Sequence, residues 1–269
     1  MPHVRVNGTS LHYVEAGAAD APPVVLSHSF LVDHRQYEAQ IEMLAGHFRV
    51  IAYDHRDHGR SDRSRTDYTI DVLTSDAVEL VRALDAAPCH WVGLSTGGFV
   101  GLRIALRFPE LLRRLVLMDT SATAESAYHR ARYGALLWIL RHVGVAPVTG
   151  AGMKAMFGPT FLHEPAFASA REVWRERMRA VDPQAMSRFG HAIFTRPDLS
   201  AVLDQIRTPT LVMVGEDDRP QPPSRAKALA AGIAGARLRV IPRAGHLSTV
   251  EQPDLVNEAL REFLVDDTD

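Results

Sequence analysis

Short apolar runs alternate with longer amphipathic stretches over most of the chain. The runs have the length of buried β-strands and occupy residues 24–26, 50–52, 91–94, 115–118, 211–214 and 238–241. Most of them are separated by enough residues for a helix, and in residues 76–84 and 99–106 the apolar positions recur every three or four residues. This alternation predicts an α/β chain with parallel strands and crossover helices.

Two segments depart from this rhythm. At the start, two alternating patterns flank Asn7-Gly8, which predicts a β-hairpin with a two-residue turn. From residue 122 to residue 203 no strand pattern appears, and prolines divide the segment into helix-like pieces. We therefore expect one α/β core, formed by residues 1–121 and 204–269, with a helical cap inserted at 122–203.

Composition narrows the class of protein. The 269 residues are 46% hydrophobic and 23% charged, as in a globular protein with a filled core, and the net charge of -2 provides no basic field for nucleic acid or anionic lipid. Cys89 is the single cysteine, the N-terminus lacks the apolar region of a secretory signal, and the most apolar stretch, 133–148, carries Arg141 and His142. We expect a cytoplasmic protein with no nucleic-acid or membrane partner.

A possible nucleophile lies where a strand meets a helix. The sequence Gly93-Leu94-Ser95-Thr96-Gly97 has the G-x-S-x-G pattern between the apolar run 91–94 and the helical pattern 99–106. A serine at such a sharp turn has a strained backbone, and its close-lying neighbours must be glycines. Beside the N-terminus of a helix, its hydroxyl would also face backbone N–H groups that can stabilise an oxyanion. The alternative is a serine that only caps the helix.

A serine nucleophile needs a base and an acid. In this architecture the acid comes after the serine in the chain, and the histidine base comes after the acid. Beyond Leu199 the chain has one histidine, His246, in the loop after the last apolar run. The loop after the preceding run offers Glu216, Asp217 and Asp218, and Asp119 is a further position for the acid. Sequence reasoning leaves the choice among these carboxylates open.

Two cofactor-binding patterns are incomplete in this sequence. Residues 54–58 contain H-x-D-H, part of a dinuclear zinc signature, but Tyr53 stands where an earlier histidine is required. No G-x-G-x-x-G follows the first parallel strand, where His28-Ser29-Phe30 stands instead. We expect no metal and no cofactor.

Five ordered motifs carry a family resemblance that covers nearly the whole chain. They are His28-Ser29-Phe30, Asp54-x-Arg56-x-His58-Gly59-x-Ser61, Gly93-Leu94-Ser95-Thr96-Gly97-Gly98, Gly215-Glu216-Asp217-Asp218 and Gly245-His246-Leu247-Ser248-Thr249-Val250-Glu251-Gln252-Pro253. With them the chain resembles the α/β-hydrolase superfamily, most of all the 3-oxoadipate enol-lactonase and cofactor-free haloperoxidase group of esterases. The resemblance implies a mostly parallel eight-stranded sheet flanked by helices, with the cap inserted after strand 6.

The resemblance also implies roles for single residues. Ser95 would be the nucleophile, His246 the base and Asp218 the acid, with Asp217 in reserve. The backbone amides of Phe30 and Thr96 would form the oxyanion hole. Two positions depart from the family pattern, since Ser29 and Asp57 stand where glycine is usual; the enol-lactonase relatives share the first departure.

Serine at position 95 favours acyl chemistry. Dehalogenases and epoxide hydrolases of this superfamily would need an aspartate there, whereas serine suits attack on an ester, lactone or thioester through an acyl-enzyme. We expect a hydrolase of a small-molecule ester or lactone; the alternatives are perhydrolysis with the same triad, and a binding protein without turnover. Trp138, in the apolar stretch 133–140, is a candidate for substrate contact, although packing of the cap explains that stretch as well.

Overall fold

A computed structural model describes residues 2–266 and contains an eight-stranded sheet in the order β1-β2-β4-β3-β5-β6-β7-β8. Strand β2 is antiparallel to β1 and β4, and the remaining pairs are parallel. The strands are β1 (His3–Val6), β2 (Thr9–Ala16), β3 (Pro23–Ser27), β4 (Arg49–Tyr53), β5 (Cys89–Leu94), β6 (Leu112–Met118), β7 (Thr210–Gly215) and β8 (Arg237–Ile241). The predicted mostly parallel eight-stranded sheet is confirmed.

Helices follow most of these strands. The α-helices are α1 (Glu38–Leu44), α2 (Ile70–Ala83), α3 (Thr96–Arg107), α4 (Ala127–Val143), α5 (Ala146–Met156), α6 (Pro159–His163), α7 (Ala168–Arg179), α8 (Pro183–Phe194), α9 (Pro223–Gly232), α10 (Ser248–Glu251) and α11 (Pro253–Arg261). Shorter turns of helix are η1 (His34–Tyr37), η2 (Pro109–Leu111), η3 (Pro165–Phe167), η4 (Ser200–Gln205) and η5 (Glu262–Asp266).

The N-terminal hairpin forms where Asn7-Gly8 predicts it. Both residues have positive φ, 44° and 74°, and Val6 pairs with Thr9 across the turn. These are the backbone angles of the two-residue turn whose twist matches that of the flanking strands.

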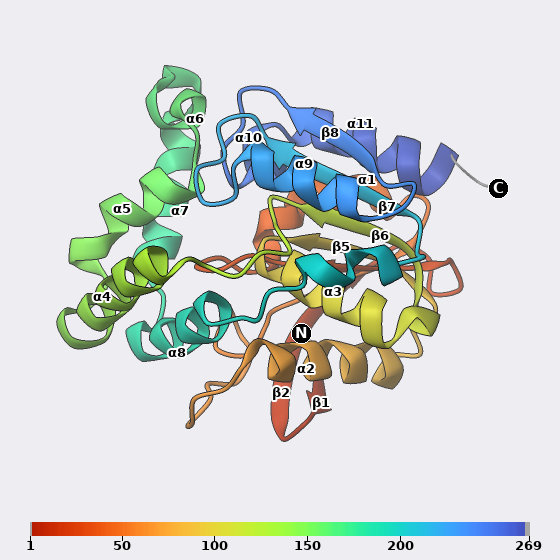
Figure 1. Ribbon diagram of the computed structural model, residues 1–269, viewed down its shortest axis with the longest axis horizontal. Coiled ribbons are helices and arrows are strands. Elements are labelled where there is room, and N and C mark those ends of the chain that lie inside the picture. The colour runs from red at the N-terminus through yellow and green to blue at the C-terminus, as the bar shows by residue number, and fades with distance from the viewer. Residues whose placement is uncertain (1, 267–269) are drawn as a thin grey trace.

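The sheet is covered on both faces, as Figure 1 shows. Helices α2, α3 and α9 pack on one face, and α1 and α11 on the other. Successive residues of a strand point to opposite faces, so Val25 joins the first layer while Val24 and Leu26 join the second. Strands buried on both faces explain the continuous apolar runs in the sequence.

Five helices, α4 to α8, lie between β6 and β7 and form the group at one end of the sheet in Figure 1. Side chains cap two of these helices, because Ser126 accepts a hydrogen bond from the His129 amide at the start of α4 and Asp182 accepts one from the Ala185 amide at the start of α8. The absence of strand patterns in residues 122–203 follows from this all-helical structure.

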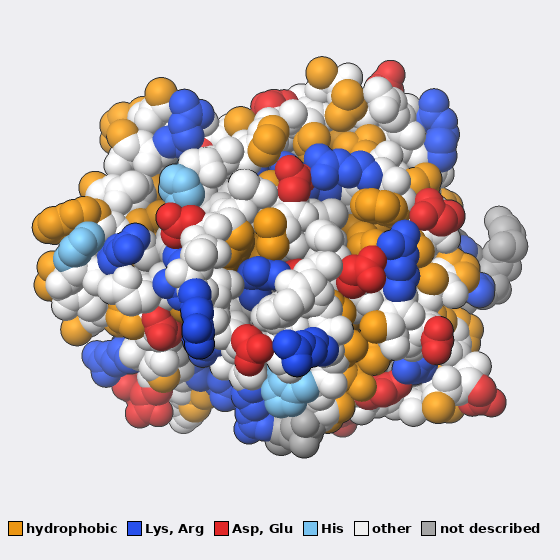
Figure 2. All heavy atoms as spheres, turned by 90° about the horizontal axis from the view of Figure 1, so that it is seen from below, with side chains coloured by type: hydrophobic (Ala, Val, Ile, Leu, Met, Phe, Trp, Pro, Cys, Tyr) orange, Lys and Arg blue, Asp and Glu red, His pale blue; other side chains and the backbone are white. Residues whose placement is uncertain are grey.

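The face of the molecule seen in Figure 2 carries charges of both signs. Figure 2 shows acidic and basic side chains interspersed with apolar ones over one face. Within residues 2–266, no helix combines the length and the hydrophobicity needed to cross a bilayer.

Candidate active site

Ser95 occupies the turn between β5 and α3. Its backbone is strained, with φ 52° and ψ -102°, and its amide donates a hydrogen bond of 2.8 Å to the Met118 carbonyl on β6. The Ser95 carbonyl in turn accepts hydrogen bonds from the Phe99 amide and the Thr120 hydroxyl. The turn is therefore fixed from both sides, and the serine is held at the carboxyl edge of the sheet.

The glycines on either side of Ser95 are required by close backbone contacts. A Cβ at Gly93 would lie 2.2 Å from the Gly97 carbonyl oxygen, and one at Gly97 would lie 1.9 Å from the Ser27 carbonyl oxygen on β3. Gly93 is thus pressed against the turn itself, as the sequence predicts, whereas Gly97 is pressed against the neighbouring strand. Neither position has space for a side chain.

The structure brings His246 and Asp218 together. His246 lies in the loop after β8 and Asp218 in the loop after β7, and the His246 Nδ1 is 2.8 Å from the Asp218 Oδ2. The Asp218 Oδ1 accepts a hydrogen bond of 2.9 Å from the Gln221 amide, so both carboxylate oxygens are occupied. Both side chains are buried, and the pairing at Nδ1 leaves the His246 Nε2 for a second partner.

The other candidate acids have different partners. Asp119 is buried, and its two oxygens accept hydrogen bonds from the Gly215 amide (2.7 Å) and the Ser248 hydroxyl (2.6 Å). Burial and the nearby Asp218 charge raise the pKa of Asp119 well above its usual value. Glu216 accepts a hydrogen bond from the Arg243 amide. Asp217 lies between Glu216 and Asp218 in the chain. Of these carboxylates, Asp218 is the one hydrogen-bonded to the His246 ring.

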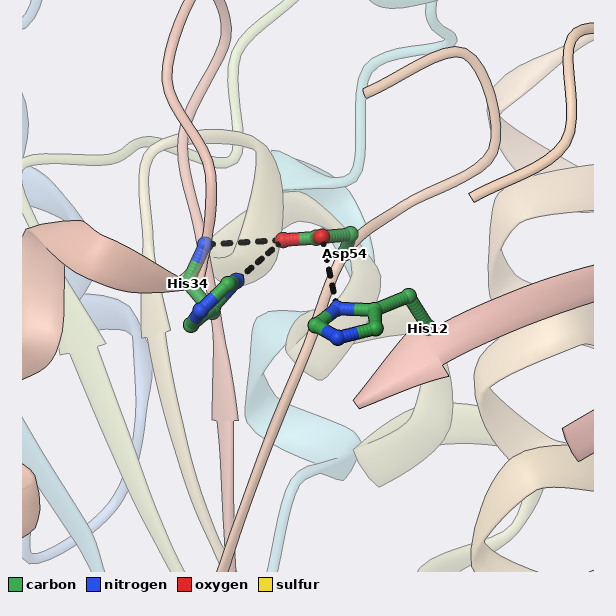
Figure 3. A group of neighbouring side chains, drawn as sticks. All are labelled: His12, His34 and Asp54. Carbon is green, nitrogen blue, oxygen red and sulfur yellow. Dashed lines mark hydrogen bonds and ion pairs between the residues drawn. The ribbon is translucent and has the colours of Figure 1, made fainter. Parts of the chain in front are cut away.

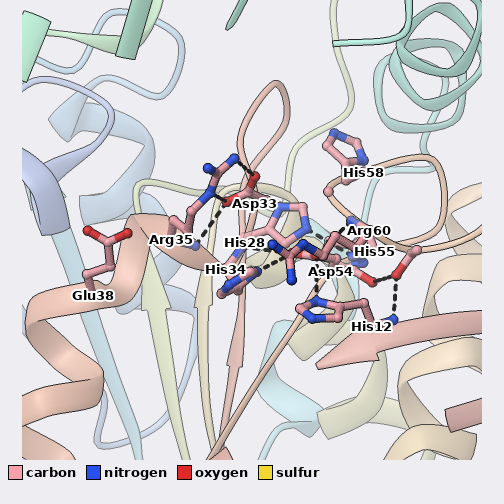
Figure 4. A network of polar contacts seen from close by, with 12 residues as sticks. His12, His28, Asp33, His34, Arg35, Glu38, Asp54, His55, His58 and Arg60 are labelled. Carbon is pink, nitrogen blue, oxygen red and sulfur yellow. Dashed lines mark hydrogen bonds and ion pairs between the residues drawn. The ribbon is translucent and has the colours of Figure 1, made fainter. Parts of the chain in front are cut away.

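The loop that carries Phe30 is braced by a buried histidine. The His28 Nε2 accepts a hydrogen bond from the His55 amide, so the Nδ1 carries the proton and donates it to the Ser29 carbonyl at 2.7 Å. Burial lowers the pKa of His28, which favours this neutral form. Figure 4 shows His28 beside His55 and His58. The His28 ring therefore links the Ser29 carbonyl to the His55 amide, and so ties this loop to the segment that follows β4.

The two predicted oxyanion donors come from this loop and from α3. Phe30 lines the cavity described below. Thr96 is the first residue of α3, where a backbone N–H has no acceptor within the helix. In the Phe30 loop the positive φ of 65° belongs to Leu31 rather than to Ser29, which explains why Ser29 can replace a glycine there.

A cavity of about 490 Å³ opens over Ser95 and His246. Most of its wall is apolar and comes from helices α4, α5, α7 and α8 together with core residues; it includes Phe30, Leu31, Phe99, Tyr133, Leu136, Leu137, Leu140, Val145, Val148, Met156, Met178, Ile193 and Phe194. A cavity of this size and lining is typical of a small-molecule site. Ser95 and His246, separated by 150 residues of sequence, therefore face one space.

Trp138 lies elsewhere. Its side chain is 60% exposed and stacks on His142 at a centroid distance of 4.7 Å, while Leu136, Leu137 and Leu140 of the same helix line the cavity. One residue corresponds to about 100° of helix rotation, so Trp138 is turned out of the face that Leu137 presents. The expectation that Trp138 contacts substrate is not supported by this geometry.

One side of the cavity wall holds a buried ion pair that sequence reasoning missed. The Glu125 carboxylate lies 3.0 Å from the Arg196 Nη2 and 3.2 Å from the Arg225 Nη1. Burial alone would raise the pKa of Glu125, but the two guanidiniums outweigh it and lower that pKa. The pairing joins residues up to 100 positions apart, so no local pattern indicates it.

One group of side chains has the residue types of a metal site, namely His12, His34 and Asp54, whose potential ligand atoms lie within 4.8 Å of one another (Figure 3). The sequence motif at 54–58 pointed to different histidines. Asp54 accepts hydrogen bonds from the His12 Nδ1 (2.9 Å), the His34 Nδ1 (2.7 Å), the His34 amide (3.0 Å) and the Arg60 amide (3.0 Å). Four N–H donors satisfy the carboxylate and orient both rings toward it. This donor set suits a structural hydrogen-bond network better than metal coordination.

Comparison with known proteins agrees with this geometry. The family described as "alpha/beta hydrolase fold" matches residues 22–253. A protein of Agrobacterium fabrum named "Putative carbamate hydrolase RutD" is 32% identical over 256 residues, covering 92% of this chain and 94% of that protein. A hydrolase of Pseudomonas aeruginosa has a similar structure, with a TM-score of 0.90, 35% identity and coverage of 98% of each chain. The enol-lactonase of Burkholderia xenovorans gives a TM-score of 0.91 and 30% identity, with coverage of 98% of this chain and 99% of the other. The chain belongs to the α/β-hydrolase family.

Proposed function

We propose that this hydrolase cleaves a carboxylic ester or lactone through an acyl-enzyme on Ser95. The main support is that Ser95, in a strained turn, lines the same cavity as His246. The His246 ring is in turn hydrogen-bonded to Asp218 at 2.8 Å. The names of the relatives support the same chemistry, because carbamates and lactones both contain a carbonyl bonded to a heteroatom that can leave.

The proposed mechanism assigns one task to each group. The His246 Nε2 accepts the Ser95 proton as the oxygen attacks the carbonyl carbon, and Asp218 keeps the ring in the required tautomer. The carbonyl π electrons move to its oxygen, where the Phe30 and Thr96 amides stabilise the charge; losing one such donor would raise the barrier by about 3 kcal/mol. The intermediate expels the alcohol, which takes its proton from His246, and water then repeats the sequence to release the acid.

We also propose that residues 122–203 act as a cap over the substrate. Helices α4, α5, α7 and α8 of this segment supply most of the apolar wall. An apolar wall excludes water from the carbonyl and favours a substrate whose acyl or alcohol part is apolar. The substrate class inferred is therefore a small, largely apolar ester or lactone.

The test is a panel of p-nitrophenyl esters of increasing chain length and several lactones, assayed with wild type and Ser95→Ala. We expect wild type to hydrolyse members of the panel and Ser95→Ala to lose roughly 10⁴- to 10⁶-fold in kcat while keeping its melting temperature. A fluorophosphonate should label wild type stoichiometrically and should not label the variant.

The same assays separate the alternatives. A folded wild type that neither turns over any ester nor reacts with the phosphonate would contradict the proposal and indicate a binding protein. Peroxide-dependent halogenation much faster than hydrolysis, abolished by Ser95→Ala, would indicate perhydrolysis by the same nucleophile.

A further inference from the structure

Helix α8 rests directly on the loop that carries Phe30. Phe189, from the middle of this helix, is fully buried and stacks parallel to the Phe30 ring, with 5.8 Å between centroids and an interplanar angle of 2°. The Phe189 ring also contacts the His58 ring edge-on, with 4.2 Å between the ring centroids. The position of α8 therefore determines what the Phe30 side chain packs against.

The residue before Phe189 attaches α8 to the core by charge. The Arg188 Nη2 lies 3.3 Å from the Asp57 Oδ1, and its Nε lies 3.4 Å from the Asp57 Oδ2, so the guanidinium spans both carboxylate oxygens. Asp57 is fully buried and also accepts hydrogen bonds from the Ser64 amide (2.7 Å) and the Tyr68 hydroxyl (2.8 Å). A buried carboxylate is costly unless it is paired, and Arg188 is the cation that faces it.

The backbone of Asp57 is left-handed, a conformation that aspartate tolerates better than most residues. Its φ is 68°, in the left-handed region that side chains other than those of glycine, asparagine and aspartate rarely adopt. A glycine would fit the backbone more easily but would leave Arg188 without its carboxylate. The contribution of Asp57 is therefore its carboxylate, which pairs with Arg188, and not its backbone conformation.

The rest of α8 connects this attachment to the cavity. Ile193 and Phe194, one turn beyond Phe189 and Gly190, line the cavity. A Cβ at Gly190 would lie 2.5 Å from the Leu137 side chain, so α8 is also packed tightly against α4, the helix beside it in Figure 1. A shift of α8 would move the cavity wall and the support of Phe30 together.

We propose that Asp57 and Arg188 are positioning residues that fix α8 on the Phe30 loop, so that the oxyanion-binding amide and the cavity wall are placed by one contact. The inference rests on the proposed function, since the Phe30 amide matters only for acyl transfer. Among the described residues, Arg188 is not one of those that line the cavity, so it acts through α8 and not by touching the substrate.

The test compares Arg188→Met with Arg177→Met. Arg177 in α7 also joins an inserted helix to the core, and its guanidinium pairs with Glu38 at 3.3 Å and lies over the Trp174 ring at 4.6 Å, which makes it a control for the loss of such an arginine. We expect Arg188→Met to lower kcat/KM by about 10- to 100-fold, mainly through kcat, because small displacements of catalytic groups have effects of that size. Arg177→Met should stay within twofold of wild type.

Two further measurements distinguish positioning from simple stability. A trifluoromethyl ketone, which forms an oxyanion on the nucleophile, should bind Arg188→Met more weakly by the same factor as the loss in kcat/KM. Asp57→Asn keeps the left-handed backbone but removes the charge, so it should reproduce the loss, and the double variant should be no worse than Arg188→Met alone. Arg188→Lys should recover part of the activity.

If wild type is active, and Arg188→Met and Asp57→Asn both fold and have the kcat/KM of wild type, this inference is wrong. The proposed function would not be affected by that result. If Arg188→Met does not fold, Asp57→Asn and Arg188→Lys decide the question on the same criteria. A wild type without esterase activity would instead refute the function on which the inference depends.

Discussion

At the scale of single residues, the acid of the proposed triad provides the sharpest test of the site. Asp218→Asn would place an amide beside the His246 Nδ1 and favour the wrong ring tautomer, so we expect kcat to fall by about 10⁴-fold. Asp217→Asn, one position earlier, should have nearly wild-type kcat because its side chain is not the one bonded to His246. Steady-state kinetics on one ester measure both.

The substitution Asp119→Asn tests the alternative acid. Its carboxylate contacts Gly215 and Ser248 instead of the histidine. Loss of activity in Asp119→Asn and retention in Asp218→Asn would assign the role of the acid to Asp119, directly after β6, and would contradict the role proposed for Asp218.

Residue-scale prediction succeeded where a motif fixes the local backbone, and failed where partners meet only in the folded chain. Ser95 and Gly93 could be predicted because the turn from β5 to α3 requires both. Asp57 pairs with Arg188 across 131 positions, and no local pattern predicts that distance. Trp138 does not line the cavity, and an apolar stretch on a helix does not reveal which of its residues faces inward.

At the scale of elements, the turn from β5 to α3 should tolerate no side chain. Gly97→Ala would force a methyl group to within 1.9 Å of the Ser27 carbonyl oxygen, and because that oxygen belongs to a central strand it cannot move aside. We expect a loss of about 3 kcal/mol or more in the free energy of unfolding, measured by urea titration.

Gly134→Ala is the matched control. Gly134 lies within α4, and a Cβ there would have no atom within 4 Å. Alanine in an exposed helix should stabilise the protein by about 0.5–1 kcal/mol. Equal effects of the two substitutions would mean that the turn is more accommodating than its contacts indicate.

The elements themselves were largely predictable. The Asn7-Gly8 hairpin and the six parallel strands appear where turn chemistry and apolar runs place them, since a strand covered on both faces has little freedom in composition. Burial is predicted wrongly only for β8, which lies at the edge of the sheet and is exposed except at Ile241. The helices at 127–194 could be recognised only as a region without strands. Their individual bounds depend on caps such as Ser126 and Asp182, and on packing between helices.

At the scale of the whole molecule, Glu251 links the inserted helices to the core. Its Oε2 accepts a hydrogen bond of 2.8 Å from the Gly158 amide just before α6, while Glu251 itself lies in α10, five residues after His246. Burial, only partly offset by hydrogen bonds from backbone amides, raises the pKa of Glu251 from 4.5 to about 7. Ionisation of this buried group therefore opposes folding.

The sign of the resulting pH dependence follows from proton binding. Between pH 4.5 and about 7 the folded protein retains a proton on Glu251 that the unfolded chain has lost, so this group makes the free energy of unfolding decrease as the pH rises through that range. Glu251→Gln can still accept the Gly158 hydrogen bond but cannot ionise. We expect it to flatten this part of the stability profile, and to be more stable relative to wild type at pH 8 than at pH 5.

Urea unfolding of wild type, Glu251→Gln and Glu258→Gln at intervals from pH 4.5 to 8.5 measures the effect. Glu258 lies on the exposed face of α11, so its substitution should leave the slope of wild type unchanged. A slope in Glu251→Gln equal to that of wild type would mean that the carboxyl at position 251 ionises without cost in the folded protein. In that case the contact between Glu251 and the Gly158 amide would have to open to water as the pH rises.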